Sequence, residues 1–169
     1  MNITPSIPGS RSNKGVTPQI VRAVVDYIAG THQTYWSYGN STVEVDEESA
    51  LTVTIGPNPI IKITKKDNND FDRVYVFAGN YYDSYGNPTD TTKERLNGIL
   101  DALGYQGVIP NNVRVFFDPD EDRCYFGRFD EKVALHRDYC VMASIEANPY
   151  LFRFDEMMIV PRKTIADRV

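Results

Sequence analysis

Residues 50–79, ALTVTIGPNPIIKITKKDNNDFDRVYVFAG, contain three runs rich in β-branched and aromatic residues, separated by two polar breaks. The runs ALTVTI, PIIKI and RVYVFA have the composition of strands, whereas GPNP and KKDNND are typical of turns. Two further runs, HQTYWSY and STVEV, precede them on either side of Gly39-Asn40. The sequence therefore predicts an antiparallel meander over about residues 32–79.

A helix is expected before this meander, over residues 18–29 within TPQIVRAVVDYIAG. Thr17 suits the N-cap, Pro18 suits the first helical position, and Gly30 is a typical C-terminal stop. The apolar residues recur at helical spacing and predict one buried stripe. They are Ile20, Val21, Val24, Val25 and Ile28.

A second helix is expected after the meander, over residues 91–103 within DTTKERLNGILDALG. Thr91 and Glu94 have the spacing of a capping box, and Gly104 supplies a stop. Gly98 in mid-helix costs about 1 kcal/mol relative to Ala, which suggests that another element approaches it closely. The predicted buried face consists of Leu96, Ile99, Leu100 and Leu103.

The last third of the chain returns to strand-like runs, namely NVRVFF, RCYFGRF, YCVMASI, YLFRF and MMIV. Strand runs without regular helix alternation predict an α+β fold, with both helices packed on an antiparallel sheet. We expect a single domain over residues 17–160, preceded by an N-terminal arm at 1–16 and followed by a basic tail at 161–169.

Charge is unevenly distributed along the 169 residues, whose net charge is −5. Residues 1–16 and 161–169 each carry +2, so residues 17–160 carry −9. An acidic body makes direct nucleic-acid binding unlikely and favours basic partners. The sequence contains no apolar run long enough for a signal peptide or a membrane span, and two cysteines do not form a disulfide scaffold. We expect the protein to lie in a reducing cytoplasm and not to associate with a membrane.

The stretch FFDPDEDRCYFGRF, residues 116–129, raises the question of a cation site. Its D-x-D-x-D spacing opens a calcium loop, but that loop then needs Gly and Glu where this chain has Arg123 and Phe129. We therefore predict an exposed, metal-free hairpin turn, with a weak cation site as the alternative. The acids of the turn are Asp118, Asp120, Glu121 and Asp122.

Other chemistry has little support in the sequence. Cys124, His136 and Cys140 lack the paired spacing of a structural zinc site. The chain has no nucleophile elbow, no phosphate-binding glycine motif and no signature of an activated thiol. We expect no cofactor, no metal and no enzymatic activity.

Aromatic residues are the remaining candidates for a binding surface. Tyr and Trp are enriched at interaction hot spots, although packing on a sheet also explains them. The predicted partner-binding residues are those of the acidic turn together with four aromatic residues. These four are Trp36, Tyr38, Tyr82 and Tyr85.

The segment NYYDSYGNPTDTTKERLNGIL, residues 80–100, resembles a pattern in small bacteriophage proteins of uncharacterised function. The matching residues are Tyr82, Ser84, Thr91, Thr92 and Asn97. The chain departs from the pattern at Arg95, where those proteins often have His. The resemblance covers about twenty residues and implies a phage origin rather than an activity.

Two hypotheses follow. The first is a non-catalytic phage accessory protein that binds a host protein in the host cytoplasm, such as a nucleic-acid-handling or defence complex, through an acidic recognition surface. The second is a structural component of the virion, joined to its neighbours through its arms.

Overall fold

The computed structural model describes residues 16–31, 34–67, 70–78 and 87–162. The candidate residues Tyr82 and Tyr85, most of the predicted arm and most of the basic tail lie outside these ranges. Within them the chain has an α+β fold with two helices and mostly sheet, as predicted. Neither described helix is long and apolar enough to cross a membrane.

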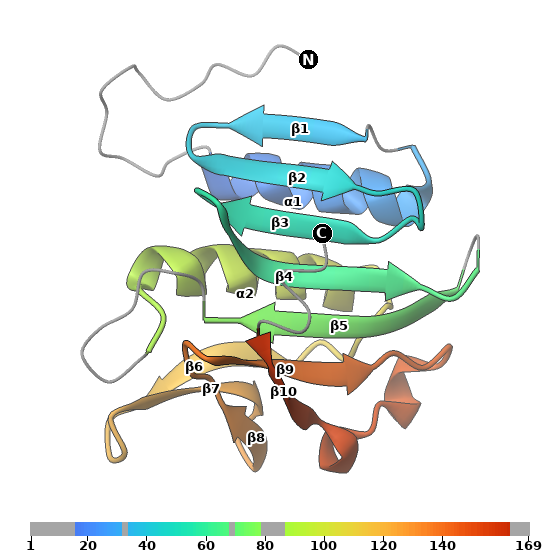
Figure 1. Ribbon diagram of the computed structural model, residues 1–169. Coiled ribbons are helices and arrows are strands. Elements are labelled where there is room, and N and C mark those ends of the chain that lie inside the picture. The colour runs from blue at the N-terminus through green and yellow to red at the C-terminus, as the bar shows by residue number, and fades with distance from the viewer. Residues whose placement is uncertain (1–15, 32–33, 68–69, 79–86, 163–169) are drawn as a thin grey trace.

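The predicted meander is present as the larger part of a seven-stranded antiparallel sheet (Figure 1). Consecutive strands pair with one another because the turns between them are short. These strands are β1 (Tyr35–Tyr38), β2 (Ser41–Val45), β3 (Leu51–Ile55), β4 (Asn58–Lys65) and β5 (Phe71–Phe77). The sheet is completed by β9 (Tyr139–Ser144), which pairs with β5, and by β10 (Met158–Pro161) at the edge.

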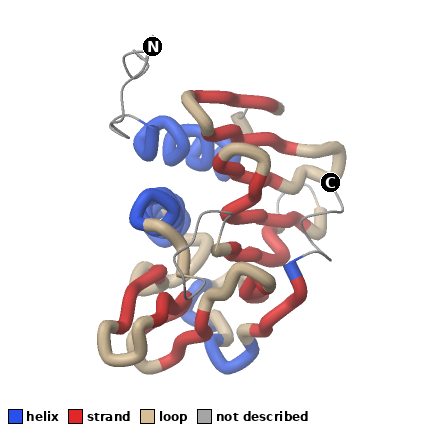
Figure 2. The backbone as a smooth tube through the Cα atoms, turned by 60° about the vertical axis from the view of Figure 1, so that its left-hand side comes forward, coloured by secondary structure: helices blue, strands red, loops and turns tan. Residues whose placement is uncertain are grey.

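Both helices, α1 (Val16–Ala29) and α2 (Asp90–Tyr105), lie against the same face of this sheet, as Figure 2 shows from the side. The two helices pack closely at Gly98, where an added Cβ would lie 2.7 Å from Cγ2 of Thr17. The expected close approach at Gly98 is therefore that of α1. The predicted stripes form the helical side of one core, except that Val21, Val25 and Ile28 are only partly buried, whereas Tyr27 is fully buried.

Three of the four helix ends differ from the predicted ones, whereas α1 ends at Ala29 and is followed by Gly30 with a φ of +80°, as predicted. The α1 helix begins at Val16, so Thr17 lies inside it. The N-cap of α2 is Thr89 rather than Thr91, and its hydroxyl accepts a hydrogen bond from the Thr92 amide at 3.3 Å. Gly104 lies within α2, and the chain leaves the helix through Gly107, whose φ is +79°. In α2, a nearby residue of the same type therefore makes both the cap and the stop.

A separate three-stranded sheet follows α2, with the order β6 (Arg114–Asp118), β7 (Arg123–Arg128) and β8 (Glu131–Ala134). Its inner residues Val115 and Phe126 belong to the main core. The side-chain amide of Asn97 on α2 donates to the carbonyl of Val115 and accepts from its N–H, both at 2.8 Å. This amide pairs with β6 as a neighbouring strand would.

The run YLFRF is not a strand, contrary to the prediction. Its ends lie in two short 3₁₀ turns, η1 (Pro149–Leu151) and η2 (Phe154–Glu156), and Phe152 and Arg153 connect them. Asn148 caps η1 by accepting a hydrogen bond from the Tyr150 amide at 3.0 Å, and Pro149 occupies the first helical position. The alternation of the run has another cause, because Phe152 and Phe154 are buried and contact each other edge to face.

Candidate binding sites

The predicted acidic turn is the connection between β6 and β7, and it has a defined backbone conformation. The carboxylate of Asp118 accepts a hydrogen bond from the Asp120 amide at 2.9 Å. Asp122 has a φ of +54°, a region that Asp tolerates better than most residues do. The side chain of Asn87 holds the end of the turn, donating to the Asp122 carbonyl at 2.8 Å and accepting from the Cys124 amide at 2.9 Å.

The acids of this turn project into solvent, as expected. Asp120, Glu121 and Asp122 are exposed, and Asp118 is half-buried. Among the described residues, none of these four forms an ion pair within 4.0 Å. By contrast, the other acidic side chains on the hairpins and turns of residues 130–156 mostly lie beside arginines: Asp130 and Glu131 beside Arg128, Asp138 beside Arg137, and Asp155 and Glu156 beside Arg153. Within residues 116–156, the negative charge without ion-pair partners is therefore concentrated at the acidic turn.

Beside this turn lies an aromatic face, which we define as Phe116, Tyr125 and Phe129 on the outer side of the small sheet. Phe116 and Tyr125 are cross-strand partners whose rings stack at 6.1 Å. The ring of Phe129, which is 82% exposed in the β7–β8 turn, stacks on Phe116 at 6.4 Å. Alternation along the strands explains the arrangement, since Val115 and Phe126 point inward.

A cation and a carboxylate from the chain itself already lie at this face. The ammonium group of Lys132 lies 5.1 Å from the ring centre of Tyr125 and 5.3 Å from that of Phe129. The Tyr125 hydroxyl donates a hydrogen bond to the Glu121 carboxylate. The aromatic face and the acidic turn therefore form one continuous surface that accepts positive charge.

The aromatic residues predicted from sequence lie elsewhere. Trp36 and Tyr38 are on the edge strand β1, where their rings stack at 5.9 Å and pack, partly buried, against the core. Figure 1 shows β1 at the opposite end of the molecule from β6–β8. The structure therefore does not bring these two residues together with the acidic turn, and Tyr82 and Tyr85 lie outside the described residues.

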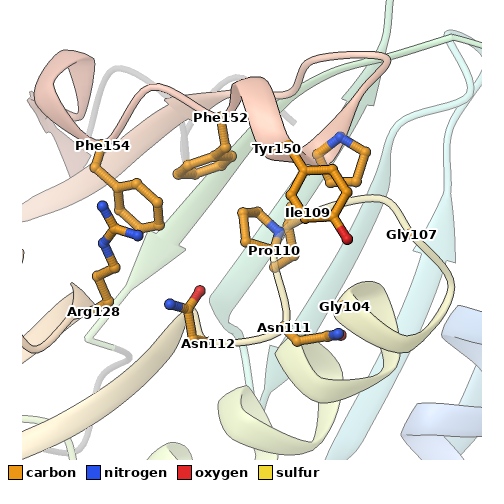
Figure 3. Close-up of a pocket in the computed structure, with 11 residues that line it drawn as sticks. Gly104, Gly107, Ile109, Pro110, Asn111, Asn112, Arg128, Tyr150, Phe152 and Phe154 are labelled. Atoms are coloured by element: carbon orange, nitrogen blue, oxygen red, sulfur yellow. The ribbon is translucent and has the colours of Figure 1, made fainter.

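A pocket of about 500 Å³ lies between the end of α2 and the two 3₁₀ turns (Figure 3). One wall is the loop 107–112, and the other is the segment 149–154. Arg128 closes one end, with its guanidinium group 4.1 Å from the ring centre of Phe154. The lining is mainly aromatic and apolar, with Asn111 and Asn112 as the principal uncharged polar groups.

Within the segment that resembles phage proteins, Asn97, which matches the pattern, and Arg95, which departs from it, both have structural roles. Arg95 is 1% exposed, and its guanidinium group donates to the Ser41 hydroxyl at 2.6 Å and to the Asn40 side chain at 3.2 Å. Burial lowers the pKa of Arg95. Arg95 and Asn97 thereby attach α2 to the β1–β2 turn and to β6, respectively.

The cysteines are free, and both are buried. Burial raises the pKa of the Cys140 thiol to about 11, which opposes its reactivity at neutral pH. Across the described part of the chain, no group of three or more His, Cys, Asp or Glu side chains is arranged to hold a metal ion.

Sequence reasoning missed the aromatic face and the pocket for different reasons. The aromatic residues of the face all lie within residues 116–129. Their position on one side of the sheet could have been predicted by assuming that strand alternation continues through the hairpin. The pocket joins segments about 40 residues apart, a proximity for which one sequence carries no signal. Comparison with known proteins finds no matching protein family, no matching curated protein and no matching solved structure.

Proposed function

We propose that this chain is a non-catalytic accessory protein that binds a basic protein partner through the acidic turn and the aromatic face. The observation that carries the proposal is the stack of Phe116, Tyr125 and Phe129 beside carboxylates that have no ion-pair partner among the described residues. Phe129 is exposed, and the other two rings are half-buried. Residues 116–132 contain six carboxylates and three cations, a net charge of −3. An exposed aromatic surface with negative charge around it fits a partner that presents arginine or lysine.

Arginine is the better match to this surface than lysine. A guanidinium group stacks on an aromatic ring with its plane and at the same time donates paired hydrogen bonds to a carboxylate. Both acceptors are present here, because Glu121 lies within hydrogen-bonding reach of the Tyr125 hydroxyl. An arginine of the partner would displace the ammonium group of Lys132, which is flexible and strongly hydrated.

A host protein that handles nucleic acid is the class of partner that we propose. Such proteins hold phosphate backbones in basic channels, and an acidic surface of this kind is complementary to them. The resemblance of residues 80–100 to small bacteriophage proteins supports a phage origin and therefore a role in the host cytoplasm. A defence complex belongs to the same class of partner.

The test is affinity purification of the full chain from bacterial cells, followed by elution with increasing salt. We expect a basic protein that elutes as salt screens the surface charge. The variant Asp120→Lys with Glu121→Lys should fail to retain it, whereas Glu47→Lys with Glu48→Lys should retain it. Both variants change the net charge by +4, but Glu47 and Glu48 lie in the exposed β2–β3 turn. Equal retention by the two variants would refute the proposal.

A structural role in the virion is the second candidate, and the edge strand β10 favours it. Met158 and Ile159 on this strand are exposed apolar residues at the edge of the seven-stranded sheet. A neighbouring chain can add a strand to such an edge. Capsid or tail proteins eluting together with this chain from infected cells, irrespective of the acidic turn, would support this role instead.

A further inference from the structure

We infer that the pocket between α2 and the 3₁₀ turns is a binding site for an uncharged saccharide. Its volume of about 500 Å³ lies in the range of about 300–1,000 Å³ that is usual for small-molecule sites. The site shares no residue with the acidic turn or the aromatic face, although its Arg128 directly precedes Phe129 in the sequence. It is therefore independent of the proposed protein partner.

The charge of the lining selects a neutral ligand. The described residues that line the pocket include no carboxylate, which disfavours a cation. Arg128 is the one charged residue of the lining, and its charge is already balanced by Asp130 at 3.3 Å and by the carboxylate of Glu131. The hydrogen bond to Glu131 raises the pKa of Arg128. An anionic ligand would have to compete with these two acids.

The polar groups of the lining match hydroxyl groups. A side-chain amide offers two donors and an acceptor, and a hydroxyl group is both a donor and an acceptor. Asn112 presents such an amide, and Figure 3 shows its side chain pointing into the space between Phe154 and Pro110, whereas the side chain of Asn111 lies along the end of α2 next to Gly104. Arg128 has further N–H donors at the end of the pocket.

The opposite wall offers one free aromatic ring. Tyr150 is 94% exposed, whereas Phe152 and Phe154 are 7% and 9% exposed and pack edge to face on each other at 4.8 Å. A proline-rich peptide docks between several exposed rings, whereas only Tyr150 is exposed among the three aromatic residues that line this pocket. A pyranose ring needs only one such surface, on which its apolar C–H face packs while its hydroxyl groups turn to the amide of Asn112.

The backbone of both walls is fixed before a ligand arrives, which reduces the entropy lost on binding. The amide of Tyr150 is held by the Asn148 cap at 3.0 Å. The other wall lies directly on α2, where an added Cβ on Gly104 would be 2.9 Å from Oδ1 of Asn111. Only a glycine at this position allows the loop to approach so closely.

The test is an NMR titration of the ¹⁵N-labelled full chain with four uncharged disaccharides: cellobiose, maltose, lactose and N,N′-diacetylchitobiose. We expect at least one of them to shift the amides of residues 107–112 and 150–154 saturably, with a Kd in the millimolar range or below. Tyr150→Ala should weaken binding about tenfold, which corresponds to about 1.4 kcal/mol. Asn112→Ala should weaken it as well.

Tyr105→Ala is the matched control, because Tyr105 is 86% exposed at the end of α2 and does not line the pocket. Its affinity for the disaccharide should equal that of the unmodified chain. Adenosine and a proline-rich peptide serve as competing probes. The inference is overturned if none of the disaccharides shifts these amides, if the shifts lie elsewhere, or if only adenosine or the peptide produces them.

Discussion

Two asparagine side chains take the place of backbone partners where the small sheet meets the rest of the molecule. Asn97 makes a reciprocal pair of hydrogen bonds with Val115, and Asn87 bridges Asp122 and Cys124. Backbone groups removed from water must find partners, and an amide can satisfy a donor and an acceptor at once. No sequence pattern indicates this role, since Asn is equally common in turns.

Asn97→Ala should therefore destabilise the fold by about 1–3 kcal/mol, because it leaves two backbone groups of Val115 without partners. Asn97→Asp should recover part of the loss, since a carboxylate accepts from the Val115 N–H but cannot donate to its carbonyl. Urea denaturation gives both free energies of unfolding. The exposed Asn112 supplies the comparison, and Asn112→Ala should change stability little.

Cys140 should make the free energy of unfolding depend on pH in the alkaline range. Burial raises the pKa of this thiol from 9.0 to about 11. The unfolded chain therefore loses this proton at lower pH than the folded chain does, and stability should fall as pH rises from about 9 to about 11. Urea denaturation at about pH 8 and about pH 10 should show a smaller loss for Cys140→Ala, despite its lower stability at pH 8. An equal loss in both proteins would contradict this prediction.

At the scale of elements, the pairing of strands adjacent in sequence was predictable, but the pairing of strands far apart in sequence was not. The meander β1–β5 follows from composition and short turns, so that each strand finds its neighbour directly along the chain. The pairing of β9 with β5 closes a gap of more than 60 residues, and one sequence holds no record of that choice. Around η1 and η2, the alternation of Phe152 and Phe154 led to the prediction of a strand, although Asn148-Pro149 is typical of a turn.

The contact between α1 and α2 can be tested at Gly98. Ala is favoured over Gly by about 1 kcal/mol inside a helix, yet its Cβ would lie 2.7 Å from Thr17 Cγ2 and 3.3 Å from Val21 Cγ2. We expect Gly98→Ala to cost about 1–3 kcal/mol, the usual range for an overpacked contact. Thr17→Ser removes the nearer methyl group, so the double variant should recover much of the thermal stability. A Tm above that of the unmodified chain for Gly98→Ala alone would show that the helices separate easily.

Across the whole molecule, the position of the acidic turn could be predicted from the sequence, but the ion pairs that neutralise the neighbouring carboxylates could not. The C-terminal strands, residues 116–160, hold ten carboxylates and five cations. Folding places Arg128, Arg137 and Arg153 beside acids close to them in sequence, which leaves the acidic turn as the main group of acids without ion-pair partners within residues 116–160. The two ends of the molecule therefore differ: Trp36 and Tyr38 support the core at one end, and charge and exposed rings meet at the other.

This arrangement predicts that the charges of the acidic turn mainly set the association rate constant of the basic partner, whereas the rings of the aromatic face mainly set its dissociation rate constant. Charges at the rim of an interface steer the encounter, so Asp120→Lys with Glu121→Lys should mainly lower kon, and added salt should do the same to the unmodified chain. Rings are buried only after docking, so Phe129→Ala should mainly raise koff. Tyr105→Ala removes an equally exposed ring outside the surface and should change neither rate.

Surface plasmon resonance at two salt concentrations measures both rates for the four proteins. Phe129 is 82% exposed, so its removal should leave the fold intact and any change in koff reflects the interface. If the charge reversal raised koff and left kon unchanged, the acids would make buried contacts rather than steer the partner. If Phe129→Ala changed neither rate, the aromatic face would lie outside the interface, and the partner would bind the acidic turn by charge alone.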